Sequence, residues 1–102
     1  MPRFDIYPMP GEGGRGYILD VQADLLTQLV TRVVVPLLPL DDFNRLTIRD
    51  LNPILEINGV RHIMVTQAIA TVPLKDLQSA IMSLADKHIL LTRALDILLT
   101  GI

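Results

Sequence analysis

Few side chains in this sequence have the types and the spacing that catalysis or metal binding requires. The two histidines, His62 and His88, do not stand with carboxylates in a pattern typical of a catalytic triad or a metal site, so we expect structural or solvated roles for both. Asp20 and Asp24 offer two carboxylates to a divalent cation, but at a transition from strand to loop they need not converge. We expect Asp20 to be an exposed strand residue and Asp24 to start a turn.

The glycine-rich segment 11–16 lacks the context of a phosphate-binding loop. It precedes a predicted strand, so it has no helix N-terminus to attract a phosphate. The sequence also has no H-x-x-x-H pair and no G-x-S-x-G motif. We therefore predict a protein that is not an enzyme and that uses no cofactor and no metal ion.

The composition favours a single domain, residues 1–102, that forms a homodimer. Half of the 102 residues are hydrophobic. A domain this small has little interior, so a second copy should cover part of its apolar surface. The net charge of −2 without a run of basic residues argues against a nucleic-acid footprint. Because the chain lacks cysteine, an apolar signal segment and an apolar run long enough for a bilayer, we expect a cytoplasmic protein.

Short strands are predicted over most of the chain. Alternating or β-branched runs mark strands at 4–7, 17–21, 31–38 and 68–72. Pro36 should lie at an edge or a bulge, because proline cannot donate to a sheet. Asn58-Gly59 within the segment 54–65 is typical of a type I′ turn and predicts a β-hairpin. The segment 74–82 stays ambiguous between a short helix and an irregular crossing.

One amphipathic helix is predicted at the C-terminus. Ser83 can cap its start with Asp86 three residues on, and Gly101 can end it in a left-handed conformation. One apolar stripe should face the core or a dimer partner: Leu84, Leu90, Leu91, Ala94, Leu95, Ile97 and Leu98. Leu99 and Ile102 then lie beside a polar face at the helix tip, which suggests insertion into a partner. Together these elements predict an α+β, mostly β domain: a small antiparallel barrel with a C-terminal α-helix.

Four segments in this order resemble the CcdB family of toxins. They are the D-V-Q-x-D motif at 20–24 with Leu25 and Leu26, the run Arg32-Val33-Val34-Val35-Pro36-Leu37, Ala70-Thr71-Val72-Pro73, and Gly101-Ile102. The resemblance spans essentially the whole chain. It implies an SH3-like barrel, a homodimer and the toxin of a toxin–antitoxin module that traps DNA gyrase on cleaved DNA. It also implies an antitoxin that wraps the toxin, and a toxin–antitoxin complex that represses its own operon.

The resemblance also implies which residues contact the gyrase A subunit. Carried over position by position, these are Leu25, Leu26, Asp96, Leu99, Thr100, Gly101 and Ile102. The two helix tips of a dimer would lie near its two-fold axis. The family pattern, however, ends in Phe-Trp-Gly-Ile, and here Leu99 and Thr100 replace the two aromatics. Losing such an anchor costs roughly 2 kcal/mol or more, so the protein either poisons gyrase through other contacts, binds it weakly, or binds antitoxin only.

Two other function classes remain open, and the antitoxin contacts are the least defined. A MazF-like endoribonuclease would need a basic groove, which Arg45, Arg49 and Arg61 would have to form by gathering in space. A dimerisation module without a toxic role would not affect growth. For the antitoxin we expect contacts at Arg15, Pro39, Leu40 and Phe43, although core packing competes for Leu40 and Phe43.

Overall fold

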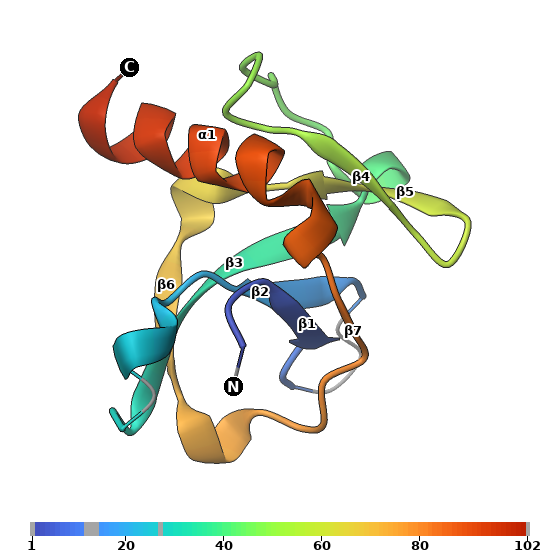
Figure 1. The fold of residues 1–102 in the computed structure, drawn as a ribbon. Coiled ribbons are helices and arrows are strands. Elements are labelled where there is room, and N and C mark those ends of the chain that lie inside the picture. Colours follow the sequence, from blue (N-terminus) through green and yellow to red (C-terminus); the bar gives the residue numbers. More distant parts are fainter. Residues whose placement is uncertain (1, 12–14, 27, 102) are drawn as a thin grey trace.

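The computed structural model describes residues 2–11, 15–26 and 28–101 as a curled antiparallel sheet with one C-terminal helix (Figure 1). The strands are β1 (Asp5–Pro8), β2 (Tyr17–Asp20), β3 (Thr31–Pro39), β4 (Ile54–Ile57), β5 (Val60–Met64), β6 (Ala70–Pro73) and β7 (Met82–Ser83). The helix is α1 (His88–Thr100). The predicted fold class, a mostly β domain with a small curled antiparallel sheet and a C-terminal helix, is confirmed.

β3 is the central strand of the sheet. The strand order is β4-β5-β3-β2-β1-β7, and β6 also pairs with β3. The first half of β3 pairs with β6 and its end pairs with β5, while β2 runs along the middle of β3. Pro36, predicted at an edge or a bulge, is not at an edge, because it pairs with Ile18 of β2 within the central strand. Pro36 lies where β3 changes partner from β6 to β5, so its missing N–H interrupts no pairing there, and its carbonyl accepts a bond from the Val65 N–H at 3.0 Å.

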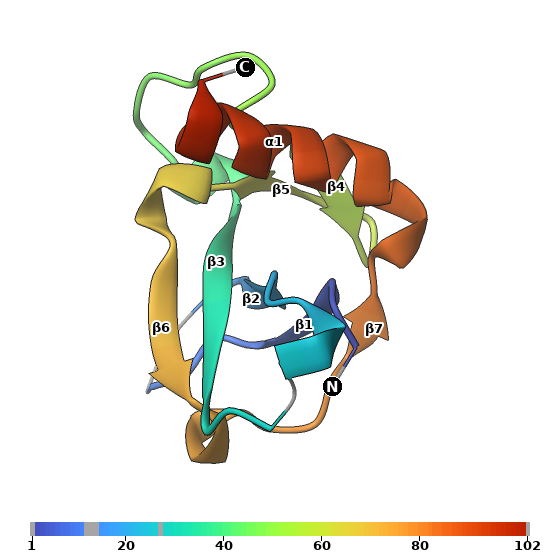
Figure 2. The ribbon, with the colours of Figure 1, turned by 60° about the vertical axis from the view of Figure 1, so that its left-hand side comes forward.

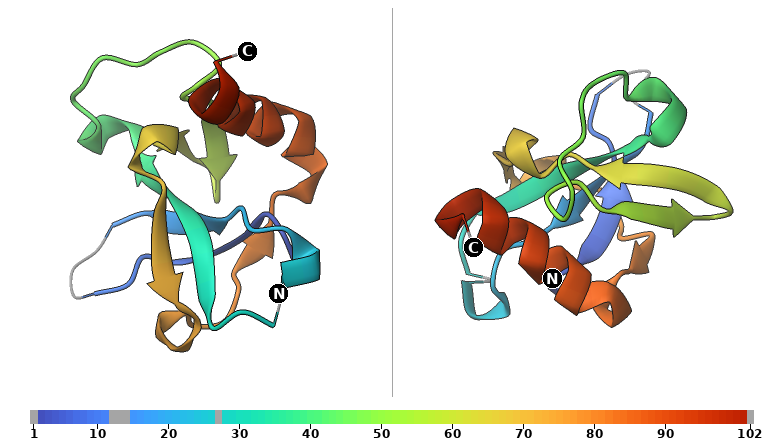
Figure 3. Two further views of the ribbon diagram at one scale, coloured as in Figure 1. Left: turned by 90° about the vertical axis from the view of Figure 1, so that its left-hand side faces the viewer. Right: turned by 90° about the horizontal axis from the view of Figure 1, so that it is seen from above.

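The core lies between the curled sheet and one face of α1. Figures 2 and 3 show α1 crossing one end of the curl, above β4 and β5. Leu91, Ala94 and Leu95 of α1 are buried against sheet residues such as Leu19 and Leu37. Leu90, expected on this stripe, is instead 37% exposed, because it lies about 100° around the helix from Leu91.

The helix begins later than its capping signal predicts. Ser83 does not cap α1, because it belongs to β7 and pairs with Asp5. The Leu84 N–H donates to the carbonyl of Phe4, the residue before β1, at 2.8 Å, so the chain stays bonded beside this strand up to Leu84. A 3-10 turn, Ala85–Lys87, follows and leads into α1. The Ser83 hydroxyl accepts the N–H of Ala85, the first residue of this turn, at 3.1 Å.

The predicted β-hairpin is confirmed. Asn58 and Gly59 between β4 and β5 both have positive φ, 53° and 79°, as a type I′ turn requires. The ambiguous segment 74–82 contains a 3-10 turn, Leu74–Asp76, and then the start of β7. Phe4, predicted as the first strand residue, precedes β1 and has a φ of 73°.

Candidate functional site

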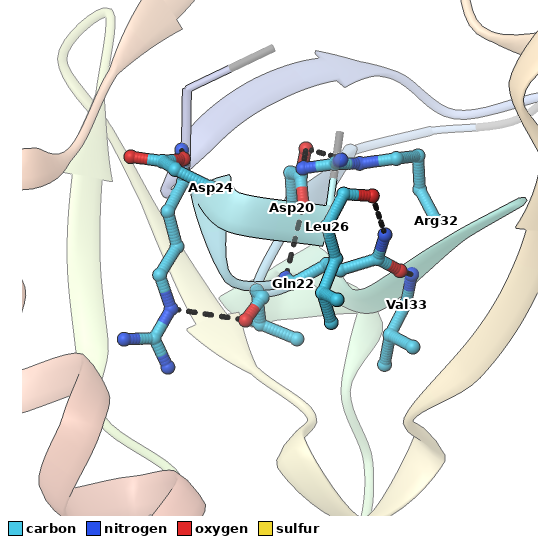
Figure 4. Close-up of polar contacts among 8 residues, drawn as sticks. Asp20, Gln22, Asp24, Leu26, Arg32 and Val33 are labelled. Carbon is cyan, nitrogen blue, oxygen red and sulfur yellow. Dashed lines mark hydrogen bonds and ion pairs between the residues drawn. The ribbon is translucent and has the colours of Figure 1, made fainter. Parts of the chain in front are cut away.

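A buried ion pair lies beneath the segment that carries the predicted loop leucines. Asp20 Oδ2 accepts from Arg32 Nη2 at 2.6 Å and from Arg32 Nε at 2.9 Å, and both side chains are essentially inaccessible (Figure 4). The expectation of an exposed Asp20 is therefore wrong. Alternation of polar and apolar residues predicted exposure, but the inward-facing Arg32 on β3 gives the carboxylate a buried partner. Burial raises the pKa of the Asp20 carboxyl above its ordinary value, and the hydrogen bond from Arg32 opposes that rise.

Gln22 connects this pair to the following turn, η1 (Asp24–Leu26). The Gln22 N–H donates to Asp20 Oδ1 at 3.0 Å. The Gln22 side-chain amide donates to Leu26 O at 3.1 Å and accepts the Val33 N–H at 3.1 Å (Figure 4). The polar residues of the D-V-Q motif thus fix the backbone on both sides of the turn, and their roles are structural.

The turn η1 presents two leucines to solvent. Asp24 starts the turn, as predicted, and its carboxylate accepts the Arg3 N–H at 2.6 Å. Leu25 is 84% exposed and Leu26 41%. Leu29 and Val30, just beyond the turn in the sequence, are exposed as well. No pattern in the sequence distinguished Leu29 and Val30 from core residues.

The tip of α1 is the second predicted contact region. Leu99 is 71% exposed, and Asp96 and Thr100 lie on the same outer side. The Thr100 hydroxyl donates to Asp96 O at 2.6 Å, so it bonds to its own helix. Gly101 ends the helix with a φ of 76° and donates to two helix carbonyls, as predicted. Ile102 lies outside the described residues.

Within one chain the two contact regions remain apart. Figures 1 and 2 show α1 at one end of the curled sheet and η1 towards the other end. Leu25 and Leu26 therefore do not form one patch with Leu99 of the same chain. A single binding surface that includes both regions needs a target that spans this separation or a second copy of the chain.

The residues predicted for the antitoxin fall into two depressions. Arg15, Pro39 and Leu40 line one of about 410 Å³, next to Val60 and Arg61 of the hairpin. Arg15 is held there by an ion pair with Asp42 at 2.8 Å. A second depression, of about 590 Å³, is lined by Phe43 together with Leu38, Arg45 and Val65. Leu40 and Phe43 are half-buried, so neither is fully committed to the core.

The histidines and the remaining arginines have separate surroundings. His62 is buried, its ring lies 5.3 Å from that of Tyr17, and its Nδ1 lies 2.9 Å from the Val60 carbonyl. His88 is exposed and bonds to Ala85 O at 3.2 Å. Arg45 and Arg61, which an RNA-cleaving groove would bring together, line different depressions.

Among residues 2–11, 15–26 and 28–101, no group of three or more His, Cys, Asp or Glu side chains is placed to hold a metal ion. Asp20 and Asp24 bond to different partners, Arg32 and Arg3, and do not converge. Within the same described part of the chain, no helix has the length and apolar character needed to cross a bilayer.

The fold is a small curled antiparallel sheet with one C-terminal helix, and it carries exposed apolar residues on η1 and at the tip of α1. The chain belongs to the CcdB family: the family model described as CcdB protein matches residues 3–101. Membership indicates a toxin of the toxin–antitoxin type. Among solved structures, the Mycobacterium tuberculosis toxin MazF-mt6 has a similar fold, with a TM-score of 0.66 at 15% identity over 90% of this chain and 92% of that chain. No curated protein sequence matches the chain significantly.

Proposed function

We propose that this protein is a cytoplasmic toxin that binds the DNA gyrase A subunit and traps the gyrase complex while the DNA is cleaved. The observation that carries the proposal is the exposed Leu25–Leu26 pair, which a buried hydrogen-bonded network holds on η1. Exposed aliphatic side chains on a rigid backbone bind with little loss of conformational freedom. We take the gyrase A subunit as the partner because the chain belongs to the CcdB family.

The helix tip is the second contact in this proposal. Asp96, Leu99, Thr100, Gly101 and Ile102 would enter the partner from the end of α1, and Leu99 offers the largest exposed apolar area among those described. A homodimer would present two copies of η1 and two tips around one two-fold axis. Such symmetry matches a two-fold target such as a gyrase A dimer.

An antitoxin would neutralise the toxin at the two depressions described above. Arg15, Pro39 and Leu40 combine a cation with apolar walls, and Phe43 adds an aromatic side chain in the neighbouring depression. This combination suits an extended segment that carries both acidic and aliphatic residues. The test is a binding titration of the antitoxin of the same module against Arg15→Ala and Leu40→Ser, with Arg93→Ala as the control on α1.

The experiment that tests the gyrase proposal is a cleavage assay with supercoiled plasmid, ATP and purified gyrase. The intact chain is compared with a version lacking residues 101–102. Linear DNA after protein digestion, seen only with the intact chain, supports a gyrase poison that works through its helix tip. Linear DNA with both versions would show that residues 101–102 are not needed and would leave η1 and the remaining tip residues as the contacts, whereas its absence with both would reject gyrase poisoning.

The same preparation should be incubated with RNA. The fold likeness to MazF-mt6 makes an endoribonuclease the second candidate. Cleavage of RNA without any effect on gyrase would replace the gyrase proposal. Binding of the antitoxin with neither activity would identify a family member that has kept only the antitoxin interaction.

A further inference from the structure

The η1 turn is held from the outside as well as from the core. On its inner side, the Gln22 side chain donates to Leu26 O in the turn, and Asp20 accepts the N–H of Gln22 just before the turn. On its outer side, Arg3 makes two further bonds: its N–H donates to Asp24 Oδ1 at 2.6 Å, and its Nε donates to Val21 O at 3.0 Å (Figure 4). These two bonds join the first described residues to the segment 21–24.

An unusual backbone conformation places Arg3 there. Phe4 has a φ of 73°, a region that residues with a bulky side chain rarely adopt. Its N–H donates to Asp20 O at 2.7 Å, its carbonyl accepts the Leu84 N–H, and its ring is buried in the core. The Arg3 guanidinium carbon lies 4.6 Å from the centre of that ring. Bonds and packing on three sides thus maintain a conformation that would otherwise be unfavourable.

We propose that Arg3 is a positioning residue that, together with the left-handed Phe4, clamps the η1 turn and so fixes the Leu25–Leu26 pair in its partner-binding conformation. The importance of that pair for gyrase rests on the function proposed above. The clamp itself is a property of the free protein. Arg3 contributes two hydrogen bonds to it, one from its backbone and one from its side chain, and each can be removed separately.

Two matched pairs of variants separate these bonds from the rest of the residue. Arg3→Met keeps the side chain as far as the ε position but replaces the Nε donor with a methyl group, whereas Arg3→Gln keeps an N–H donor at the ε position. Asp24→Ala removes the acceptor, whereas Asp24→Asn keeps a side-chain oxygen. Arg61→Met, at an exposed arginine of the hairpin, controls for loss of a positive charge.

Amide hydrogen exchange of the free protein measures the clamp directly. The backbone amides of Gln22, bonded to Asp20 Oδ1 just before the turn, and of Leu26, bonded to Ala23 O, should exchange about five- to tenfold faster in Arg3→Met and Asp24→Ala. Arg3→Gln, Asp24→Asn and Arg61→Met should stay close to the parent protein. Unchanged exchange at these two amides in Arg3→Met, or an equal acceleration at all core amides, would overturn the proposal.

Gyrase cleavage by the same variants then links the clamp to function. We expect Arg3→Met and Asp24→Ala to need about five- to tenfold more protein for the same yield of linear DNA, in proportion to the opening of the turn. If amide exchange becomes faster in the variants but the parent protein does not trap gyrase, the gyrase proposal fails and the clamp stands. If the parent traps gyrase and Arg3→Met does so equally well in spite of faster exchange, the positioning role is wrong.

Discussion

Asp20 and Arg32 form a buried ion pair in which Oδ2 and Nη2 lie 2.6 Å apart, directly under the turn that carries the exposed leucines. The aspartate belongs to β2 and the arginine to β3, so the pair joins neighbouring strands at the point where the chain leaves the sheet. Its second carboxylate oxygen binds the Gln22 N–H. The surface turn is therefore bonded to a group inside the domain.

Breaking this pair should destabilise the whole domain. Asp20→Ala removes the carboxylate from a buried guanidinium, and we expect a loss of about 3–5 kcal/mol in the free energy of unfolding. The double variant Asp20→Val/Arg32→Met should lose less, because it buries no charge. Urea unfolding followed by circular dichroism measures both. A double variant less stable than Asp20→Ala would contradict this account.

The exposed leucine at position 25 should matter for binding and hardly at all for stability. Leu25→Ser removes a side chain that is 84% exposed, so the free energy of unfolding should change by about 0.5 kcal/mol or less. The yield of linear DNA in the gyrase assay should fall at least about fivefold if the residue contacts the partner. Leu46→Ser is the matched control, since Leu46 is 88% exposed in a different loop. Equal losses in both variants would indicate a non-specific effect of surface hydrophobicity.

Thr100 is the position at which an aromatic anchor should strengthen gyrase binding. Thr100→Trp restores the residue of the family pattern and adds a large apolar surface to the tip, and we expect roughly 2 kcal/mol of binding, about thirtyfold in affinity. Thr100→Val serves as the comparison, because it removes the hydroxyl bond to Asp96 O without adding an anchor. Isothermal titration against the gyrase A subunit gives both affinities. A tryptophan variant no tighter than the valine variant would show that the tip does not insert.

Gly16 is required by a close approach of two strands. A Cβ at this position would lie 2.2 Å from the Leu37 carbonyl oxygen, and the φ of 92° is itself unfavourable for other residues. We expect Gly16→Ala to cost about 3 kcal/mol or more, from the backbone conformation and the clash together. Gly59→Ala changes a glycine that also has positive φ but has nothing within 4 Å, so it should cost only about 1 kcal/mol. Thermal unfolding of the two variants measures both losses of stability. Similar losses in Gly16→Ala and Gly59→Ala would show that the close contact with β3 is unimportant.

Tyr7 should make the domain lose stability at alkaline pH. Burial raises the pKa of the Tyr7 phenol above its ordinary value of about 10, and the negative charges of Asp20 and Asp5 raise it further. The folded state then holds the phenol proton more tightly than the unfolded chain, so stability is lost as the pH rises above 10. In Tyr7→Phe the free energy of unfolding should fall less steeply with pH above 10. The control Tyr17→Phe should keep the steeper fall of the parent protein, because it retains Tyr7. Parallel profiles for Tyr7→Phe and the parent protein would contradict this prediction.

The sequence was sufficient to predict features that depend on local backbone chemistry. Asn58-Gly59 specified its turn because few residues tolerate two positive φ angles in succession, and Gly101 specified the helix end for the same reason. β-branched runs located β3 to within a residue. The start of α1 was missed, because the bond from Leu84 to Phe4 keeps Ser83 in a strand, and no local signal reports that bond.

The buried and surface roles of the site residues were harder to predict. Asp20 alternated with apolar residues like an exposed strand residue, and only its partner Arg32, twelve positions away, reveals that it is buried. Leu25 and Leu26 are leucines of the kind that usually pack in a core, but both are exposed, as the resemblance to the family implied. Arg3 carried no signal, since its two contacts depend on an exceptional φ at Phe4.

The change of partner along β3 has a consequence for how the chain folds. The β1–β2 and β4–β5 pairings are local in sequence and can form early, whereas β3 joins them to each other and to β6 across longer loops. We expect docking of β3 to limit the folding rate. Val35, at the middle of that strand, should then have a high φ-value, meaning that its contacts are largely formed in the transition state.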